Sequence, residues 1–408
     1  MRINQCRICK SKKLVKLFSL GNLNFTGKFS SLGKKIKKKP ITLMMCKVCD
    51  LVQLAHNYDL KYLYGPDYGY RTGINKTMRN HVKKIAKFLS KKTLLKKNDH
   101  VLDIASNDGS LLNYYNKNVV KCGIDPILKK YENNYQNIKF AIPGFFSASK
   151  IKAKTKRKFK IITALSVFYD AEDPNKFLSD VKELLMPNGI FLLEFADLAS
   201  ILRFKMFDTI CHEHLEYYSS KVIINLTNQN GLKVFDIKEN KINGGSKQYF
   251  ICLKDSKIPS KNKLIKRVLK FENKLKLNKT STFQKFFKNI NKLKKDLNLL
   301  IKSIKDKNQN VHGYGASTKG NVILQYFKIN NNKINYIAER NKNKYGLFTP
   351  GTNIKIISEK TSRDLSPHYY LVLPWHFKNE ILKRERNIIK KGIKFIFPLP
   401  KIKIVSKT

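Results

Sequence analysis

The sequence predicts an α/β protein in which two strand-and-helix modules follow a small cysteine-rich module. Three observations support this fold class: two CxxC pairs near the start, a strand-like run with a glycine-containing turn at 101–112, and a second pattern of this kind from residue 310. Short apolar runs that alternate with helical sequence indicate a parallel sheet covered by helices. A chain of 408 residues is long enough for two or three domains.

The cysteine-rich module carries one pair at Cys6 and Cys9 and a second pair at Cys46 and Cys49. Four thiolates on two tight turns match the tetrahedral coordination of a structural Zn²⁺, which leaves no open position for catalysis. A redox role is the alternative, but it is typical of a single CxxC pair at the start of a helix. The odd total of seven cysteines favours a reducing compartment over a disulfide framework, so we expect a cytoplasmic protein. No apolar run is long enough for a membrane span and MRINQCRICKSKK is no secretory signal, so we expect no membrane partner.

The first α/β module begins with the helical run MRNHVKKIAKFL and continues with VLDIASNDGSLL. This second run predicts a strand, a turn that ends in Asn107, Asp108 and Gly109, and then a helix whose N-terminus approaches a ligand closely. Asp125 ends the next strand, KCGIDP, where an acid accepts hydrogen bonds from ribose hydroxyls. Ala105 and Asn107 stand where a GxGxxG pattern has glycines, so adenosine without a pyrophosphate fits better than a dinucleotide. An ordinary strand-to-helix turn with a capping Asp is the alternative.

The densest group of reactive side chains is FDTICHEHLEYYS at 207–219, where His212, Glu213 and His214 follow one another. The two imidazoles stand at i and i+2, not at the i and i+4 of a helical metalloprotease site, and no third metal ligand is evident. A general base is the better use, because proton removal beside a carbonyl needs a base of near-neutral pKa that a carboxylate orients. A structural histidine pair is the alternative.

The second α/β module follows a lysine-rich helical stretch between about 260 and 308, which we expect to pack against its own chain rather than in a coiled coil. Its apolar face consists of Phe283, Phe286, Phe287, Ile290, Leu293, Leu297, Leu300, Ile301 and Ile304. From residue 310, NVHGYGASTKGNVILQYF predicts a strand, a turn and a helix, and NYIAE, YLVLPW and KFIFPLP predict further strands. The GYGASTKG turn and Glu339 also fit a nicotinamide-dependent enzyme, or a plain packing turn.

The charge of the chain is strongly positive, with a formal net charge of +53 from 82 Lys and Arg against 29 Asp and Glu. A nucleic-acid-binding protein is one interpretation, because clustered lysines neutralise phosphates. The lysines are spread along the whole chain without a recognition-helix pattern, which favours a solvated surface and no specific nucleic-acid partner. Such a surface attracts an anionic substrate, including a sugar diphosphate.

Taken in order, these motifs resemble a known family, the zinc-containing, S-adenosylmethionine-dependent sugar C-methyltransferases that act on nucleotide-linked 4-keto-6-deoxysugars. The resemblance covers nearly the whole chain. It rests on the CxxC pairs with LVQL, PDYGYRTG, DIASNDGSLL, GIDP, PGFF, FYDAEDPNKFL, DTICHEHLEYYS, NGGS, GYGASTKGN, FTPGT, LVLPWHF and FPLP. It implies a zinc-binding module at 1–62, a Rossmann-like class I methyltransferase domain at 63–255, and a Rossmann-like α/β domain at 256–408 that helps to hold the nucleotide sugar. The implied protein is a monomer or weak dimer.

The resemblance also implies the roles of individual residues. Cofactor binding falls to Ala105, Asn107, Asp108, Gly109, Asp125, Phe145, Phe146, Leu165 and Ser166. Substrate binding falls to Tyr217, Asn243, Gly244, Gly245, Ser246, Tyr314 and Lys319, with Lys319 on the diphosphate. The chemistry falls to His214 as the base, with Glu213 and His212 as its shell, and to Tyr70 and Tyr169 beside the sugar.

The implied reaction removes a proton from the carbon next to the ketone and methylates the enolate carbon, because a sugar carbon is no nucleophile before it loses that proton. Tyr70 or Tyr169 would stabilise the enolate oxygen. Methylation of a sugar hydroxyl, which needs no ketone, is the alternative reaction. The chain departs from the family pattern at Cys211, where Tyr is usual, and at Tyr169, where His is frequent, and both positions would border the sugar.

Overall fold

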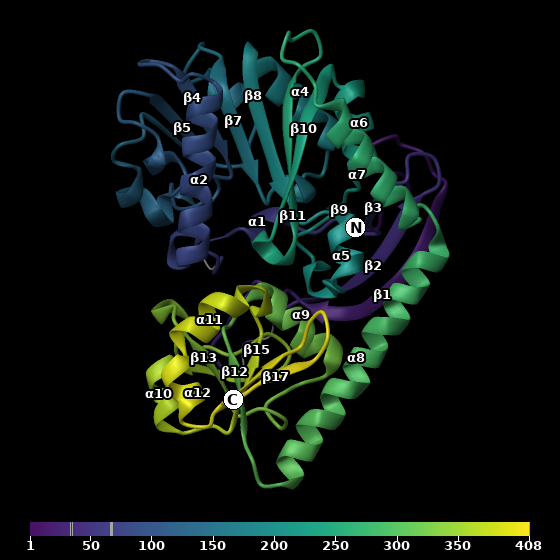
Figure 1. Ribbon diagram of the computed structural model, residues 1–408, viewed down its shortest axis with the longest axis vertical. Coiled ribbons are helices and arrows are strands. Elements are labelled where there is room, and N and C mark those ends of the chain that lie inside the picture. The colour runs from purple at the N-terminus through teal and green to yellow at the C-terminus, as the bar shows by residue number, and fades with distance from the viewer. Residues whose placement is uncertain (33, 35, 66–67, 408) are drawn as a thin grey trace.

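The computed structural model describes residues 1–32, 34, 36–65 and 68–407, so Pro66 and Asp67 of the PDYGYRTG run lie outside the described residues. Three sheets organise the described chain. Figure 1 shows one α/β module above the other, with the N-terminal strands and the long helix α8 running along one side of both. The predicted fold class, a small module followed by two Rossmann-like α/β modules, is confirmed.

The upper module contains a seven-stranded sheet in the order β10-β11-β8-β7-β4-β5-β6. Its strands are β4 His100–Ile104, β5 Val120–Asp125, β6 Phe140–Pro143, β7 Phe159–Leu165, β8 Leu185–Phe195, β10 Leu232–Asn240 and β11 Ser246–Leu253. All neighbouring strands are parallel except β11, which runs antiparallel to both β8 and β10. The first strand, β4, has β5 on one side and β7 on the other, so the strand order reverses there, and ligands bind at such a switch point.

The lower module repeats this plan in a six-stranded sheet with the order β14-β13-β12-β15-β16-β17. Its strands are β12 Val311–Tyr314, β13 Tyr336–Glu339, β14 Lys355–Ser358, β15 Tyr369–Val372, β16 Lys394–Phe397 and β17 Lys403–Val405. Only β17 is antiparallel to its neighbour. The order reverses at β12, which creates a second switch point.

The N-terminal module is a four-stranded antiparallel sheet in the order β1-β2-β3-β9, formed by β1 Leu14–Asn24, β2 Lys38–Cys46, β3 Val52–Leu54 and β9 Glu216–Tyr217. Helix α8, Thr280–Asp306, packs on β1, where Phe18 stacks on Phe287 at 4.8 Å between ring centroids. The predicted apolar face of this helix is buried or half-buried along its whole length. The helix therefore packs against its own chain, as expected.

The remaining helices are distributed over the three modules. They are α1 Leu60–Leu63, α2 Lys76–Lys92, α3 Ala148–Lys152, α4 Pro174–Leu184, α5 Leu198–Arg203, α6 Ser220–Gln229, α7 Asn262–Lys274, α9 Thr318–Phe327, α10 Glu359–Asp364, α11 Lys378–Arg384 and α12 Arg386–Lys390. None of the helices in the described ranges is both long and apolar enough to cross a bilayer.

Two local predictions were wrong. The helix expected after the first glycine-containing turn is only the 3₁₀ turn Leu112–Tyr114, because the backbone is already extended at Tyr115 and the asparagine-rich sequence beyond it favours turns over helix. The stretch expected to be helical from about 260 to 308 is broken between α7 and α8, where Lys276 adopts a left-handed backbone with φ of 50°.

Candidate active site

The main cavity of the described chain lies between the two Rossmann-like modules and has a volume of about 590 Å³. The segments that follow β4, β5 and β7 line it from one side, and the segments that follow β12, β13 and β15 line it from the other. Both switch points therefore open into one space, where each sheet presents its carboxyl edge. A cavity of this size is typical of a small-molecule site.

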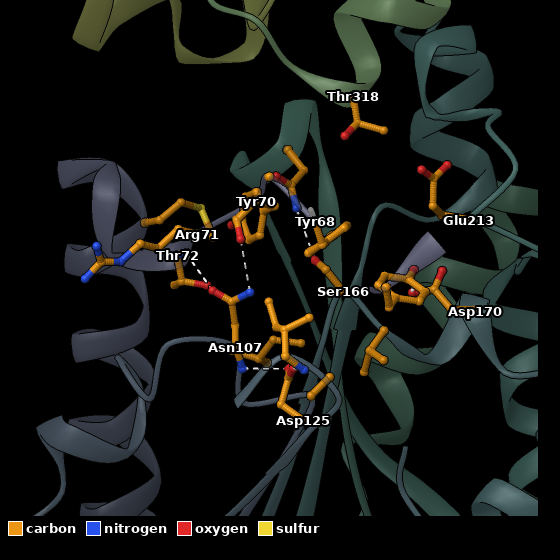
Figure 2. Close-up of a pocket in the computed structure, with 18 of the residues that line it drawn as sticks. Tyr68, Tyr70, Arg71, Thr72, Asn107, Asp125, Ser166, Asp170, Glu213 and Thr318 are labelled. Carbon is orange, nitrogen blue, oxygen red and sulfur yellow. Dashed lines mark hydrogen bonds between the residues drawn. The ribbon is translucent and has the colours of Figure 1, made fainter. Parts of the chain in front are cut away.

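The backbone after β4 and β7 turns away from each strand in the left-handed conformation, with φ of 57° at Ala105, 51° at Asn107 and 57° at Ser166. This conformation is uncommon for residues other than glycine and clusters at ligand sites. The Asn107 N–H donates to Asp125 Oδ2 at 2.8 Å, which ties the turn to the end of β5 (Figure 2). The other Asp125 oxygen accepts from the Ile127 N–H at 2.8 Å. The carboxylate is thereby fixed at the rim of the cavity.

The side chain of Asn107 also positions the loop that covers the cavity. Its Oδ1 accepts from the Thr72 N–H at 3.0 Å and its Nδ2 donates to the Tyr70 carbonyl at 3.3 Å. Figure 2 shows Tyr70, Arg71 and Thr72 lying over the turn. The sequence did not predict this second use of Asn107, because the two segments are far apart along the chain.

The cavity fits adenosine on the side of the first switch point. Apolar walls come from Ile104, Ile124 and Ile127, and the rings of Phe145 and Phe146 close one flank. Together with an anchored carboxylate for the ribose, these walls supply the apolar and polar contacts that an adenosine needs.

Seven of the nine residues predicted to bind the cofactor line the cavity: Ala105, Asn107, Asp125, Phe145, Phe146, Leu165 and Ser166. Asp108 does not; its buried carboxylate accepts from the Gly73 N–H at 2.9 Å and from Arg71 Nε at 3.1 Å. Gly109, with φ of 71°, packs beneath the turn against Tyr135 and Ile138. Both support the loop and the turn from behind.

The imidazole of His214 lines the cavity and is held from two sides. Its Nδ1–H donates to the Thr209 carbonyl at 2.7 Å, and the ring of Tyr169 lies 4.2 Å away between centroids. With its proton on Nδ1, the other nitrogen, Nε2, has a free lone pair. Burial, and then the positive charge of Lys319, lowers the pKa of His214 to about 3, so the ring is neutral at physiological pH.

The two other residues of the His-Glu-His run point to different places. Glu213 lines the cavity, and its Oε2 accepts from the Thr26 hydroxyl at 3.3 Å. His212 is fully buried away from the cavity, between the rings of Phe25 and Tyr58, and its Nε2 lies 3.1 Å from the Lys39 carbonyl. The run forms a turn rather than a strand, so the adjacent residues Glu213 and His214 both face the cavity, while His212 contacts the N-terminal module.

The two tyrosines predicted to border the sugar both line the cavity. Tyr70 is 40% exposed at its mouth, whereas Tyr169 is buried beside His214. Partial burial raises the pKa of Tyr70, and full burial raises the pKa of Tyr169 well above its usual value, so both hydroxyls keep their protons and can donate hydrogen bonds. Cys211 is fully buried and is not among the residues that line the cavity.

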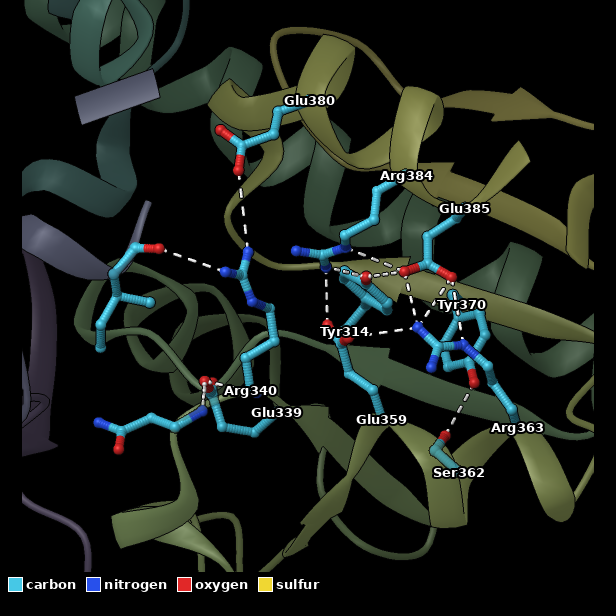
Figure 3. Close-up of polar contacts among 12 residues, drawn as sticks. Tyr314, Glu339, Arg340, Glu359, Ser362, Arg363, Tyr370, Glu380, Arg384 and Glu385 are labelled. Atoms are coloured by element: carbon cyan, nitrogen blue, oxygen red, sulfur yellow. Dashed lines mark hydrogen bonds and ion pairs between the residues drawn. The ribbon is translucent and has the colours of Figure 1, made fainter. Parts of the chain in front are cut away.

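Of the residues predicted to bind substrate, Asn243 and Lys319 line the cavity, whereas Tyr217, Gly244, Gly245, Ser246 and Tyr314 do not. The Tyr217 hydroxyl donates to the His214 carbonyl at 3.0 Å, so it supports the base from behind. The Tyr314 hydroxyl donates to Glu385 Oε1 at 2.7 Å and belongs to a buried polar cluster with Arg363 and Arg384 (Figure 3). That cluster connects β12 to the helices of the lower module.

Several polar residues of the cavity were not predicted. Asp170 accepts from the Tyr64 hydroxyl at 2.7 Å through Oδ2, while its buried Oδ1 has no partner among the described residues. Burial, with the nearby charge of Glu213, raises the pKa of Asp170 well above its usual range. Figure 2 shows Asp170 and Glu213 on the same side of the cavity.

Two further histidines line the cavity. They are His376 and His81, and His81 Nε2 lies 2.7 Å from Glu194 Oε1. Asp170 lies in the FYDAED run and His376 in LVLPWHF, so the available signal was that each is a titratable residue inside a motif that carries the family resemblance.

The four cysteines of the N-terminal module meet in one cluster, with their Sγ atoms within 4.8 Å of one another. Cys6 and Cys49 are separated by 3.5 Å, as are Cys9 and Cys46. Tetrahedral coordination at about 2.3 Å places sulfurs roughly 3.8 Å apart, so the cluster fits Zn²⁺. Each knuckle ends in a left-handed residue whose N–H donates back to the first cysteine carbonyl, Lys10 to Cys6 and Asp50 to Cys46.

Comparison with known proteins adds the class of enzyme. A zinc binding domain model matches residues 6–64, a methyltransferase domain model matches 74–237, and a C-methyltransferase C-terminal domain model matches 241–400. The C-methyltransferase NovU of Streptomyces niveus is 25% identical over 414 residues, which cover 99% of this chain and 97% of that protein.

Two solved structures are also similar over part of the chain. An S-adenosylmethionine-dependent methyltransferase from Clostridium acetobutylicum ATCC 824 has a TM-score of 0.35 at 15% identity, covering 43% of this chain and 92% of that one. Magnesium protoporphyrin IX methyltransferase from Synechocystis PCC 6803 has a TM-score of 0.33 at 15% identity, covering 47% and 91%.

The strand order, the anchored acid after β5 and the matching domain model define an S-adenosylmethionine-dependent methyltransferase. Because the C-terminal and N-terminal models match as well, the chain is an S-adenosylmethionine-dependent C-methyltransferase with a zinc binding domain, similar over its whole length to NovU. Its cofactors are S-adenosylmethionine and a structural zinc ion, as predicted. These matches favour carbon methylation over the oxygen-methylating, nicotinamide-dependent and nucleic-acid-binding alternatives.

Proposed function

We propose that this enzyme methylates the carbon beside the ketone of a nucleotide-linked keto-deoxysugar, with His214 as the base. The tautomer of His214 carries this proposal. Its Nδ1–H is committed to the Thr209 carbonyl, so Nε2 is the nitrogen free to accept a proton. A carbon next to a ketone is the kind of sugar carbon that gives up a proton readily, which matches a C-methyltransferase with a neutral imidazole in its cavity.

The charge of the lower module supports a nucleotide diphosphate as the handle of the substrate. Arg340, Lys344 and Arg384 line the cavity on that side. The buried ammonium of Lys344 donates to the Ala316 carbonyl at 2.7 Å, in the turn that follows β12. Glu339, at the end of β13, accepts from the Ala316 N–H at 2.6 Å, as Asp125 accepts from Asn107 in the upper module. A nucleotide sugar whose diphosphate binds at the turn after β12 would have its sugar in the same cavity as His214. The proposal includes a reducing cytoplasmic location.

The residues of the chain have distinct tasks in this reaction. S-adenosylmethionine, when bound, supplies a methyl group already activated for transfer to carbon. Asp125 and the turn at Ala105 and Asn107 hold the adenosine, which places the reacting side of the cavity beside Ser166. His214 takes the proton on Nε2, and Tyr169 keeps the imidazole plane in place by ring contact. Productive geometry requires the reacting atoms to lie about 3–3.5 Å apart, so the lower module must hold the nucleotide with its sugar against these residues of the upper module.

The test uses the purified enzyme with S-adenosylmethionine and the 4-keto-6-deoxyhexoses of TDP, GDP, CDP and UDP. One of them should yield a product heavier by one methylene group, and its ¹³C spectrum should show a new carbon–carbon bond. In D₂O without S-adenosylmethionine, the hydrogen next to the ketone should exchange. The absence of methylated product from all four sugars would refute the keto-sugar assignment.

His214→Asn is the decisive variant. We expect it to lower both exchange and methyl transfer by about 10²–10⁴-fold, because general-base catalysis contributes that much. Its affinity for S-adenosylmethionine should remain unchanged, because the adenosine contacts lie on β4 and β5. Isothermal titration calorimetry measures that affinity and serves as the folding control. Exchange at the normal rate in His214→Asn would place the base elsewhere.

A further inference from the structure

Lys319 reaches the same side of the cavity as His214, although it belongs to the other module. It is the second residue of α9, whose N-cap is Ser317. Its Nζ donates to the Asn243 carbonyl at 3.1 Å, and Asn243 Nδ2 donates to the Ser166 hydroxyl at 3.2 Å. This chain of contacts places the ammonium beside the end of β7, where the reacting side of the cavity lies.

The ammonium group of Lys319 lies among the reactive groups of the site. Lys319, His214 and His376 all line the cavity, and the positive charge of Lys319 adds to burial in lowering the pKa of both imidazoles. Asp208 and Cys211 are the groups that favour its charged form, but the Asp208 carboxylate already accepts from the Trp375 indole at 2.8 Å. Lys319 therefore lies in the cavity between the two modules, together with His214.

This ammonium has few partners of its own. Within residues 1–32, 34, 36–65 and 68–407, its hydrogen-bond partner is one carbonyl, and no carboxylate lies within 4.0 Å of Nζ. A cation that is taken from water without an anion is costly, so such a group is suited to an anion that forms in the cavity. Removal of a proton by His214 adds a second positive charge at this place, which strengthens the need for a negative charge between them.

We propose that Lys319 donates a hydrogen bond to the ketone oxygen of the substrate and stabilises the negative charge of the enolate. This inference rests on the proposed function and deepens it. The C–H bond next to the ketone breaks, its proton goes to His214 Nε2, and its electron pair forms the carbon–carbon double bond. The carbonyl π pair moves to the oxygen, which the ammonium of Lys319 faces. When the carbon takes the methyl group, the carbonyl reforms and the sulfur keeps the electron pair of its broken bond. His214 then gives its proton to solvent, and Lys319 returns to its first state.

This role differs from the diphosphate contact that the sequence predicted for Lys319. Lys344 occupies a better position for the diphosphate, because its ammonium lies on the turn after β12 at the Ala316 carbonyl. Lys319 instead reaches across to the upper module, where its ammonium donates to the Asn243 carbonyl. A diphosphate contact would act mainly on KM, whereas stabilisation of the enolate would act on kcat.

The test compares Lys319→Met with Lys295→Met, a matched change at an exposed lysine of α8, on whichever of the four keto-sugar nucleotides the unaltered enzyme methylates. We expect kcat of Lys319→Met to fall by about 10²–10³-fold, the loss typical of one oxyanion donor, with KM changed little. Exchange of the hydrogen next to the ketone in D₂O should fall in parallel. Lys319→Arg, which keeps the charge, should retain more activity than Lys319→Met, and added ethylammonium should partly restore Lys319→Ala.

The outcomes separate the two proposals. If the unaltered enzyme neither methylates any of the sugars nor exchanges the hydrogen next to the ketone, both the proposed function and this inference are refuted. If the unaltered enzyme turns over and Lys319→Met keeps its kcat with a raised KM, only the enolate role is refuted. Unchanged affinity for S-adenosylmethionine in each variant shows that a loss of kcat is not a loss of folding.

Discussion

At the scale of single residues, the site depends on which nitrogen of His214 carries the proton. The Thr209 carbonyl fixes that choice, because it accepts from Nδ1 at 2.7 Å. Tyr217 donates to the carbonyl of His214 itself and so holds the backbone. A base that is neutral and oriented in the resting enzyme needs no proton loss before it acts.

The first residue-scale prediction concerns the pH dependence of the reaction. Burial lowers the pKa of His214 to about 3, below its usual value of 6.5, so its base form persists as the pH falls through 6.5. The plot of kcat/KM against pH should therefore stay flat from pH 8 to about 5 on the acid side. A tenfold loss of kcat/KM per pH unit below 6.5 would contradict a buried neutral base.

The second residue-scale prediction concerns the charge next to His214. Because the Lys319 charge lowers the pKa of His214, Lys319→Met should raise that pKa. NMR of enzyme with ¹³C-labelled histidine rings, with the signal assigned through His214→Asn, measures the shift without substrate. A pKa of His214 that is unchanged in Lys319→Met would show that the two side chains are further apart than their coupling requires.

At the scale of elements, the zinc knuckles and the base are connected by one strand pair. β3 begins just after the second knuckle and pairs with β9, which begins just after His214. Val52 faces Tyr217 and Gln53 faces Glu216 in this register. The zinc-binding module therefore supports the loop that carries the base, even though the metal does no chemistry.

Loss of zinc should consequently act on catalysis as well as on folding. Cys9→Ser should release the metal and destabilise its module by about 3 kcal/mol, roughly 12–24 °C in melting temperature for a domain of about 60 residues. We expect kcat to fall while the affinity for S-adenosylmethionine persists, since its contacts lie on β4, β5 and β7. Metal analysis, thermal melting and calorimetry measure these three effects. Cys252→Ala, which removes a thiol outside the cluster, is the control, and an unchanged kcat in zinc-free Cys9→Ser would contradict the connection.

Local patterns in the sequence predicted most elements near the site but not their pairing. The apolar runs at KCGIDP, FKIITALS and KFIFPLP form β5, β7 and β16, because a short run between turn signals defines a strand locally. The pairing of β3 with β9 joins segments about 160 residues apart, and no local signal encodes such a contact. For this reason His212 was expected beside the base, whereas it packs between Phe25 and Tyr58 of the N-terminal module.

At the scale of the whole molecule, the active site exists only where the two modules meet. His214 and the cofactor turn belong to the upper module, and Lys319 and Lys344 belong to the lower one. The sequence predicted two α/β modules, but not that their carboxyl edges face each other, because that arrangement depends on surfaces distributed over the whole chain. Contacts that hold the modules together should therefore control both binding and rate.

Glu380 on α11 is the residue best placed to show this control. The Glu380 Oε2 atom accepts from the Thr77 N–H at 3.1 Å, at the start of α2. The Glu380 Oε1 atom lies 3.8 Å from Arg340 Nη1 (Figure 3). Arg340 Nη2 in turn donates to the Ile74 carbonyl at 3.2 Å. Glu380→Ala should loosen the start of α2, which walls the cofactor side of the cavity through Met78. We expect weaker binding of S-adenosylmethionine, by about tenfold if roughly 1.4 kcal/mol of closure is lost. Calorimetry measures the affinity, with Lys383→Ala on the same helix as the control. Hydrogen bonds to charged groups contribute about 1.5–3 kcal/mol, so the loss of this one should be measurable. An unchanged affinity in Glu380→Ala would show that the two modules stay together without this contact.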